Sequence, residues 1–497
     1  MKHIERIFLG TIIIFIIFLS IFLGTRKTGY HVDEVWTFGL ANNVGDIVPS
    51  LEYGKVYVAD ELYKDFVQVD SDHRFDYVNV WNNQSKDVHP PFYYILVHTI
   101  CSIFPNTYNM WYGLAINLFW SVGILMLLYK LAKAITSNNI ISLAIILIYG
   151  TTVAYFDTML LIRMYAQFTF FTIALSYLFK KYWDRTLDKK FYVLLSAIAI
   201  LGLFTHYYFL IYMFFISVAF AIHLFLEKKY IELKKCIFVA LGDGLLYILA
   251  WYHILSHLFR GYRGKQAISA AFSFDDVFKK IIGIFHILNL EAFFGLLPLF
   301  MIITILLCFT YIKKRGAKYN FEVAMFLSGF FFVLVVGKVA PLTTARYIMP
   351  IVFISIIVAY LALNNFLAFW INKKASVYLT TIVFLVINFL NLYSRSFYVP
   401  NDYNSDTESA LEKYLEDKEC TIYINDTWEC LYYFKQAQHA KSYTFVNPDT
   451  VDLLSSLGEG DILAADNSYS EIISKYVSAD TVFESGDITF YEVNEVK

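Results

Sequence analysis

Two adjacent carboxylates, Asp33 and Glu34, follow closely on the first apolar segment of the chain, in the stretch GYHVDEVWTFGLANN. A carboxylate can act as a general base that removes the proton of a hydroxyl group while the hydroxyl oxygen attacks a carbon atom. An acidic pair beside a membrane can equally be a solvated edge of a loop. The pair therefore has to be interpreted together with the other polar residues of the chain.

Further polar residues occur at the ends of later apolar segments, in the stretches KDVHPPFYYILVH, LLIRMYAQ, LFTHYYFL and GKVAPLTTARYIMP. An arginine side chain presents a planar fork of donors that can bind a phosphate group at two points, whereas lysine presents a point charge. Taken singly, each cation could be an anchor at the lipid headgroups, and a lone histidine is more often structural. The candidate site residues in these stretches are Asp87, His89, Arg163, Tyr165, His206, Lys338, Arg346 and Tyr347.

The joint arrangement of these residues is more informative than any one of them. Polar residues that are scattered along the sequence, but gathered at one membrane depth, indicate a site at the boundary of lipid and water. Carboxylates, cations and a histidine on the same side of the membrane would suit a transfer reaction with a phosphate leaving group. The sequence therefore favours a reaction at the membrane surface.

Composition identifies the class of protein that positions these residues. The chain has 497 residues, of which 58% are hydrophobic and 16% are charged. These values are too apolar for an ordinary soluble protein of this length, and they indicate a membrane protein that crosses the bilayer many times. The formal net charge of -2 provides no global basic surface, so nucleic acid is not expected as a partner.

Long apolar runs predict the membrane segments. After Lys2 and Arg6, the run from Ile7 to Gly24 is typical of a signal anchor with a cytoplasmic N-terminus, and a cleaved signal peptide is the alternative. Together with the later runs it predicts about 11–12 membrane helices. The later runs are Pro91–Phe104, Trp111–Leu131, Ile140–Phe156, Tyr165–Phe179, Phe191–Phe204, Tyr207–Leu226, Cys236–Leu258, Ala292–Ile312, Phe321–Val336, Tyr347–Trp370 and Val377–Tyr393.

Basic residues in short loops predict which ends of these segments face the cytoplasm. The loop 25–89 and the tail after Arg395 are then extracytoplasmic. This arrangement requires an odd number of crossings, so one run does not cross, and the short run Pro91–Phe104 is the best candidate. The basic clusters are Lys180, Lys181, Arg185, Lys189 and Lys190; Lys228, Lys229, Lys234 and Lys235; Lys313, Lys314, Arg315 and Lys318; and Lys373 and Lys374.

The tail differs from the rest of the chain because it is polar and acidic. Residues 395–497 alternate strand-like and helix-like patterns, which predicts a small soluble α/β domain. The tail contains no nucleotide-binding motif. Cys420 and Cys430 both lie in it, and the sequence leaves open whether they form a disulfide. No pair of closely spaced cysteines and no histidine-rich cluster supports a structural zinc site.

Several motifs together resemble a known family. They are the Asp33–Glu34 pair after the first membrane segment, H-P-P-F-Y-Y at 89–94, R-M-Y-A at 163–166, T-H-Y-Y at 205–208 and A-R-Y-x-x-P at 345–350. The chain resembles the integral membrane glycosyltransferases of the GT-C class, and within it the family 39-like, mannosyltransferase-type bacterial proteins. The resemblance covers about residues 1–393 and is strongest before Leu226.

The resemblance implies a GT-C transmembrane domain over residues 1–394, with residues 25–89 as an extracytoplasmic catalytic loop. It also implies transfer of a sugar from a polyprenyl-phosphate donor to a glycan, lipid or protein acceptor at the plasma membrane. Asp33 would be the general base and Glu34 would orient the loop or the acceptor. Arg346, then Arg163, and Lys338 would bind the donor phosphate. Substrate-binding roles would fall to Asp87, His89, Tyr165, His206 and Tyr347.

A single displacement by one base would invert the anomeric carbon. No metal or other cofactor is required by this scheme, although a divalent metal ion is compatible with it. A flippase or transporter for lipid-linked sugars is the main alternative, but its charges should lie at the middle of the bilayer rather than at the outer helix ends. A membrane protein that docks partners through its tail would have no need of the Asp33–Glu34 pair.

Overall fold

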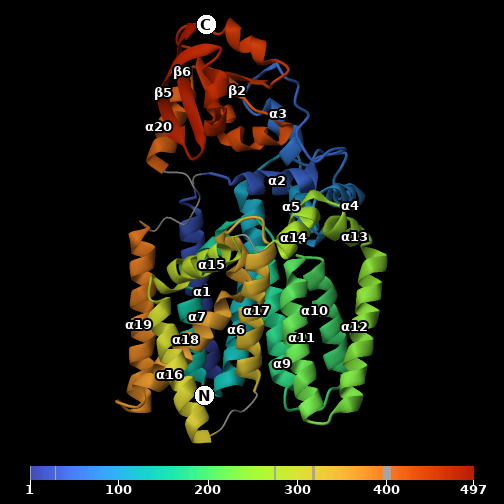
Figure 1. Cartoon of the computed structure of the whole chain (residues 1–497), viewed down its shortest axis with the longest axis vertical. Coiled ribbons are helices and arrows are strands. Elements are labelled where there is room, and N and C mark those ends of the chain that lie inside the picture. The colour runs from blue at the N-terminus through green and yellow to red at the C-terminus, as the bar shows by residue number, and fades with distance from the viewer. Residues whose placement is uncertain (1, 28, 274–275, 316–319, 396–404) are drawn as a thin grey trace. The chain divides into compact units, whose positions relative to one another are not determined.

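The computed structural model describes residues 2–27, 29–273, 276–315, 320–395 and 405–497 (Figure 1). The chain divides into two compact units, which we call the helical unit and the sheet unit. The helical unit comprises Met1–Arg26, Val88–Tyr93 and Leu114–Val399, and the sheet unit comprises Lys27–Asp87, Tyr94–Gly113 and Pro400–Lys497. The sheet unit thus contains parts of both the predicted first loop and the tail. The predicted domain boundary after residue 394 stays a prediction.

The helical unit is a bundle in which many long helices run side by side (Figure 1). Its 3-10 helices are η1 Ala345–Tyr347 and η2 Met349–Ile351. Its α-helices are α1 Lys2–Gly24, α6 Met110–Thr136, α7 Asn139–Tyr149, α8 Val153–Leu160, α9 Tyr165–Tyr182, α10 Lys189–Leu203, α11 Tyr208–Leu226, α12 Tyr230–Ala250, α13 His253–Phe259, α14 Tyr262–Phe272, α15 Val277–Phe293, α16 Leu297–Arg315, α17 Phe321–Val339, α18 Val352–Leu367 and α19 Lys373–Ser394.

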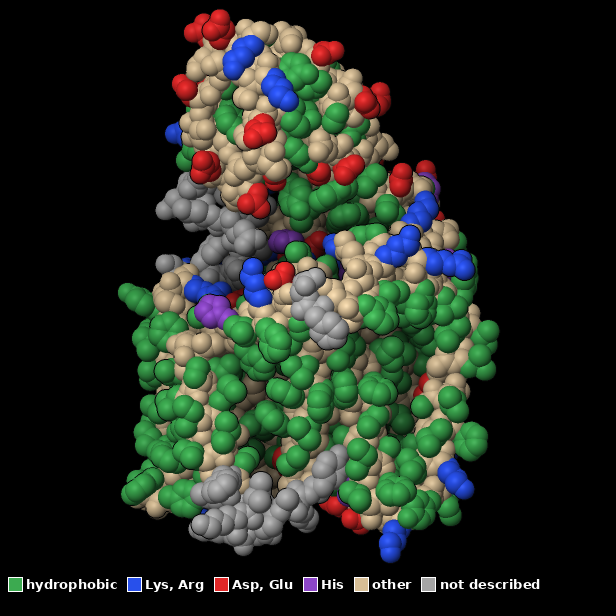
Figure 2. Space-filling view, viewed as in Figure 1, with side chains coloured by type: hydrophobic (Ala, Val, Ile, Leu, Met, Phe, Trp, Pro, Cys, Tyr) green, Lys and Arg blue, Asp and Glu red, His purple; other side chains and the backbone are tan. Residues whose placement is uncertain are grey.

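The chain is a multi-pass membrane protein. Within the described residues, six helices are long and apolar enough to cross a membrane, and the number reaches nine if each of three bent helix pairs is one span. The helix α5, Phe92–Ile103, has 12 residues, so its length of about 18 Å falls short of a hydrocarbon core of about 30 Å. The short run that contains α5 was the one predicted not to cross. Figure 2 shows the broad apolar face that the helical unit presents.

Two of the predicted continuous segments, Ile140–Phe156 and Cys236–Leu258, are bent instead of straight, and a third bend lies at the start of the run Ala292–Ile312. The pairs α7 with α8, α12 with α13, and α15 with α16 turn by 60°, 93° and 95°. At the first bend, Thr152 caps α8 by accepting a hydrogen bond from the Tyr155 amide at 3.1 Å. At the third, Asn289 accepts from the Leu297 amide at 2.8 Å, and Gly295 has a φ of +86°. Caps and turns of this kind interrupt a helix while the sequence around them stays apolar.

The segment Arg260–Leu288, between the predicted runs Cys236–Leu258 and Ala292–Ile312, contains α14 and the first part of α15. The third basic cluster ends at Lys318, which lies outside the described residues, as do residues 396–404 at the start of the tail.

The sheet unit contains a six-stranded sheet in the order β1-β3-β2-β4-β6-β5. The strands β3, β2 and β4 are parallel, and the remaining neighbours are antiparallel. This arrangement confirms the α/β prediction for the tail. The strands are β1 Val56–Tyr57, β2 Glu419–Tyr423, β3 Ser442–Val446, β4 Ile462–Asp466, β5 Val477–Ser485 and β6 Ile488–Val496. The helices are α2 Val32–Asn42, α3 Glu61–Val67, α4 Tyr77–Lys86, most of α5, α20 Ser405–Leu415, η3 Thr427–Tyr433, α21 Phe434–His439, η4 Val451–Ser456, η5 Asn467–Tyr469 and α22 Ser470–Ile473.

Residues of the first loop complete the sheet that the tail forms. Strand β1 pairs with β3, with Tyr57 opposite Tyr443. The Tyr63 hydroxyl on α3 donates a hydrogen bond to the Cys430 carbonyl at 2.7 Å. Cys430 and Cys420 are buried free thiols. Backbone pairing and buried polar contacts therefore hold the first loop and the tail together as one unit.

Candidate catalytic and phosphate-binding residues

Asp33 lies in the first turn of α2, and the cap of this helix fixes its place. The Asp33 amide donates to Nδ1 of the N-cap residue His31 at 3.1 Å, and the His31 amide donates to Oε2 of Glu34 at 2.8 Å. This reciprocal pair is a capping box, which satisfies amides that a helix start would otherwise leave unpaired. The Asp33 side chain is 22% exposed, and its Oδ2 lies 3.8 Å from His31 Nδ1. The positive end of the helix dipole favours the ionised carboxylate.

Glu34 has a different environment from its neighbour. Its side chain is 0% exposed, and the Lys27 ammonium donates to both of its carboxylate oxygens, at 2.9 and 2.8 Å. Glu34 thus takes part in a buried ion pair as well as in the cap of α2. These contacts suit the orienting role predicted for Glu34 better than a catalytic one, because both carboxylate oxygens bind the Lys27 ammonium and one of them also binds the cap amide.

Replacement of Glu34 by Gln is expected to destabilise the protein by about 3–5 kcal/mol, because the Lys27 charge stays buried without its carboxylate partner. The double variant Lys27→Met with Glu34→Gln should recover much of this loss, since it leaves no uncompensated charge. Thermal unfolding of the purified protein in detergent measures both effects. A single Glu34→Gln variant as stable as the native protein would show that the ion pair does not hold α2.

Aromatic side chains of the tail lie beside α2. The rings of Trp36 and Trp428 stack with centroids 6.0 Å apart, and the centroid of the Tyr432 ring lies 5.6 Å from that of Trp428. Burial, and then the negative charge of Asp33, raise the pKa of Tyr432. Trp428 and Tyr432 were not among the site residues predicted from the sequence. The concentration of aromatic residues in the stretch DTWECLYYF was the available signal.

Asp87 is the C-cap residue of α4, where its amide donates to the Asn83 carbonyl at 3.1 Å. It ends the first segment of the sheet unit, whereas His89 belongs to the helical unit. Asp33 and Glu34 also belong to the sheet unit. The other candidate residues, His89, Arg163, Tyr165, His206, Lys338, Arg346 and Tyr347, belong to the helical unit.

His206 is the centre of a cluster in the helical unit, at the turn between α10 and α11. It is 6% exposed, and its ring stacks on Phe168 with centroids 5.2 Å apart, while Tyr165 lies at 5.7 Å. The Tyr208 amide donates to His206 Nδ1 at 3.0 Å. An accepting Nδ1 assigns the proton of the neutral ring to Nε2, which is then a hydrogen-bond donor.

Positive groups converge on this histidine. Arg163, a buried residue just before α9, has its Nη2 3.4 Å from Nε2 of His89, and the His89 ring lies 5.9 Å from that of His206. Burial, and then the charges of His89, Arg163 and Arg346, hold the pKa of His206 well below its ordinary value. The structure therefore brings together several of the residues that the sequence assigned to the outer helix ends.

The pKa of His206 makes stability depend on pH. As the pH falls below about 6.5, the unfolded chain takes up a proton at this residue, whereas the folded protein does not. His206 therefore contributes stability above that pH, and the contribution is lost at up to about 1.4 kcal/mol per pH unit as the pH falls toward the folded pKa. We expect the decrease in Tm between pH 7.5 and pH 5.5 to be smaller for His206→Gln than for the native protein. Equal decreases would contradict this coupling.

Tyr347 and Lys338 have separate surroundings. Tyr347 packs its ring 5.5 Å from that of Tyr208, and the Arg346 guanidinium lies 5.5 Å from the centre of the Tyr347 ring. Tyr347 thus joins the His206 cluster. Lys338, at the end of α17, donates to the carbonyl of Ser273, the C-cap of α14. The described contact of Lys338 stabilises the end of α14, and its predicted phosphate-binding role stays a prediction.

A second polar network, which was not predicted from the sequence, braces the turn that carries His206. The Tyr207 hydroxyl lies 2.7 Å from Nδ1 of the buried His257, and the Trp251 indole donates to the same hydroxyl at 2.9 Å. His257 and Trp251 flank the bend between α12 and α13. Their position near the end of the run Cys236–Leu258 was a signal, because the basic cluster Lys228–Lys235 marks the opposite end of that run as cytoplasmic.

The cluster can bind an anion. Two arginines and a neutral histidine that donates through Nε2 are typical ligands of a phosphate group, and aromatic rings pack against the histidine. Among the described residues, no group of three or more His, Cys, Asp and Glu side chains is arranged to hold a metal ion. The prediction that no metal is required stays a prediction.

No protein-family model and no curated protein matches the sequence. Solved structures match in fold. The apo oligosaccharyltransferase of Archaeoglobus fulgidus is 10% identical, with 96% of this chain and 74% of that chain covered and a TM-score of 0.50. AglB from the same organism, in complex with an inhibitory peptide and a dolichol-phosphate, is 10% identical. The match covers 99% of this chain and 74% of AglB, with a TM-score of 0.47. ArnT from Cupriavidus metallidurans, bound to undecaprenyl phosphate, is 10% identical. The match covers 93% of this chain and 96% of ArnT, with a TM-score of 0.44. The chain has the GT-C fold of membrane glycosyltransferases, as its motifs predicted.

Proposed function

We propose that the protein transfers a sugar from a polyprenyl-phosphate donor to an extracytoplasmic glycan, lipid or protein acceptor. The observation that carries this proposal is the cluster in which Arg163 lies against His89 beside the buried His206, while the charge of Arg346 acts on the same histidine. Such a cluster suits a phosphate group better than an uncharged sugar, because arginine matches phosphate oxygens with two donors. The GT-C fold and the sequence motifs support the same class of reaction.

In the proposed reaction, the acceptor hydroxyl oxygen attacks the anomeric carbon of the sugar while Asp33 removes the hydroxyl proton. The bond between that carbon and the lipid-phosphate oxygen breaks, and its electron pair leaves with the polyprenyl phosphate. Arg346 and Arg163 stabilise the charge that develops on the phosphate. One displacement inverts the configuration of the anomeric carbon.

The other predicted residues have supporting roles in this proposal. Glu34 and its partner Lys27 hold the helix start that carries Asp33. Tyr165 and Tyr347 form part of the aromatic wall around the phosphate. The roles of Asp87 and His89 in substrate binding, and of Lys338 as a further phosphate ligand, belong to the same proposal. A divalent metal ion is compatible with it but supplies none of its steps.

The direct test is sugar transfer in proteoliposomes that contain the purified protein, a polyprenyl-phosphate sugar and a mixture of acceptors. We expect a glycosylated product, which mass spectrometry identifies, and release of polyprenyl phosphate in equal amount. Movement of the donor across the bilayer without any transfer would instead support a flippase. Neither transfer nor movement with donors of several sugar classes would contradict both functions.

The proposed orientation places the tail outside the cell and the loop after α9 in the cytoplasm. In a background without native cysteines, Lys475→Cys should react with a membrane-impermeant maleimide on intact cells. Lys189→Cys should react only after the membrane is permeabilised. Both positions are exposed, so access to the reagent depends on the side of the membrane. The reverse pattern would move the proposed reaction to the cytoplasmic side.

A further inference from the structure

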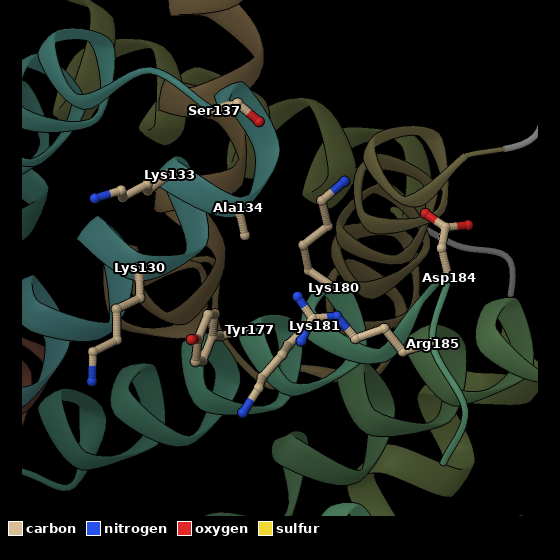
Figure 3. A pocket seen from close by; sticks show the side chains of 9 residues that line it. All are labelled: Lys130, Lys133, Ala134, Ser137, Tyr177, Lys180, Lys181, Asp184 and Arg185. Atoms are coloured by element: carbon tan, nitrogen blue, oxygen red, sulfur yellow. The ribbon is translucent and has the colours of Figure 1, made fainter.

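The helical unit contains a pocket of about 510 Å³ between the C-terminal ends of α6 and α9 (Figure 3). Five basic side chains line it, against one acidic side chain, Asp184. The basic residues are Lys130 and Lys133 from α6, and Lys180, Lys181 and Arg185 from α9 and the turn after it. The volume falls within the range of about 300–1,000 Å³ that is typical of ligand pockets.

Two of the five cations have carboxylate partners. Lys133 is paired with Glu5 of α1, and Lys180 with Glu322 of α17 at 2.7 Å. Over the described part of the chain, no salt bridge neutralises Lys130, Lys181 or Arg185. With Asp184 as the single acidic side chain of the lining, the pocket has an excess of positive charge, and like charges repel unless a counter-ion binds. The excess of positive charge in the pocket therefore favours the binding of an anion.

This pocket is separate from the His206 cluster. Helix α9 has 18 residues, so its two ends lie about 27 Å apart. Arg163 and Tyr165 stand at its beginning, and Lys180 and Lys181 at its end. This separation is close to the thickness of the hydrocarbon core, about 30 Å. The two basic sites therefore lie at the levels of opposite headgroup layers.

We propose that this pocket binds the phosphate-bearing headgroup of an anionic phospholipid. Basic pockets between membrane helices on the cytoplasmic side are suited to such headgroups. Lysine and arginine provide charge-assisted hydrogen bonds to the phosphate oxygens, and the half-buried Tyr177 on the pocket wall adds a hydroxyl group. The acyl chains of the lipid would lie along the apolar flanks of the bundle.

The simpler explanation is that these residues only orient the protein in the membrane. Basic residues in a loop are sufficient for that purpose. Lys130 and Lys133, however, lie on the helix α6 itself, three residues apart and therefore on one face. They share the pocket wall with cations from α9. A bound headgroup would bridge the two helix ends and stabilise the bundle, and this effect requires no sugar transfer.

The test is retention of lipid by the purified full-length protein in detergent, measured by native mass spectrometry. Phosphatidylglycerol is the anionic probe, and phosphatidylcholine is the zwitterionic control. We expect the native protein to retain phosphatidylglycerol preferentially. The triple variant Lys130→Gln, Lys181→Gln, Arg185→Gln should bind it at least about tenfold more weakly, because each cation contributes to the attraction.

A matched triple variant distinguishes the pocket from general surface charge. Lys189→Gln, Lys190→Gln and Lys234→Gln also remove three positive charges, from exposed positions outside the pocket lining. This variant should retain the lipid as the native protein does. The charge-conserving variant Lys130→Arg, Lys181→Arg, Arg185→Lys should also retain it, which excludes misfolding as the cause of the loss.

Three results would overturn the proposal. Equal loss in the pocket variant and the matched variant would indicate diffuse electrostatic attraction. Equal retention of phosphatidylcholine and phosphatidylglycerol would exclude recognition of the anionic headgroup. Protection of the native protein against thermal unfolding by inorganic phosphate, without retention of phosphatidylglycerol, would indicate a soluble phosphate ligand instead of a lipid.

Discussion

The Asp33→Asn variant is expected to transfer sugar about 10²–10⁴-fold more slowly than the native protein, the loss that is typical when a general base is removed. Asparagine retains the size of the side chain and much of its hydrogen bonding, but it does not accept a proton near neutral pH. The Asp33 side chain is partly exposed, and it stands at the start of a capped helix. Folding and donor binding should therefore survive. The measurement is the transfer rate per folded enzyme at saturating donor.

Two other carboxylates provide the controls for this experiment. Asp65 is an exposed residue on α3 in the same unit, and Asp65→Asn should leave transfer unchanged. Glu34→Gln should reduce the amount of folded protein more than the rate per folded molecule, since Glu34 is ion-paired and buried. Near-normal transfer by Asp33→Asn together with an inactive, folded Glu34→Gln would assign the base to Glu34. Full activity of both variants would exclude a catalytic role for the pair.

The sequence was sufficient to predict most of the helices and the class of fold. Membrane helices need long apolar runs, and the runs that predicted α11, α17 and α19 match the observed helices closely. The cluster around His206 was also predictable in outline. Polar residues at the ends of membrane helices have few reasons to be there other than function or anchoring, so Arg163, His206 and Arg346 were prominent in the sequence.

The bends in the membrane segments could not be predicted from hydropathy. The run Ile140–Phe156 is apolar on average, yet the cap at Thr152 divides it into two helices. A cap depends on one side-chain hydrogen bond, which the apolar character of the whole segment does not reveal. The same limitation concealed the bend beside Trp251 and therefore the contact between His257 and Tyr207.

Contacts between distant parts of the sequence were also beyond prediction. Strand β1 has two residues, and only its pairing with β3, almost four hundred positions later, makes it a strand. The ion pair of Lys27 with Glu34 illustrates the point at short range. The sequence showed two neighbouring carboxylates, but it could not show that one of them is fully buried against a lysine while the other is partly exposed.

Replacement of Arg346 by Ala is expected to lower kcat/KM for the polyprenyl-phosphate donor by about 10- to 100-fold, because hydrogen bonds to a charged partner contribute about 1.5–3 kcal/mol. Arg346 is half-buried in η1, and its charge acts on His206. Arg346→Lys should restore only part of the loss, since an ammonium group cannot reproduce the planar fork of a guanidinium. Arg260→Ala, which removes an exposed arginine at the end of α13, should leave the donor kinetics unchanged. Native kinetics in the Arg346→Ala variant would reduce Arg346 to an anchor at the membrane surface and would leave Arg163 and His206 to bind the donor phosphate.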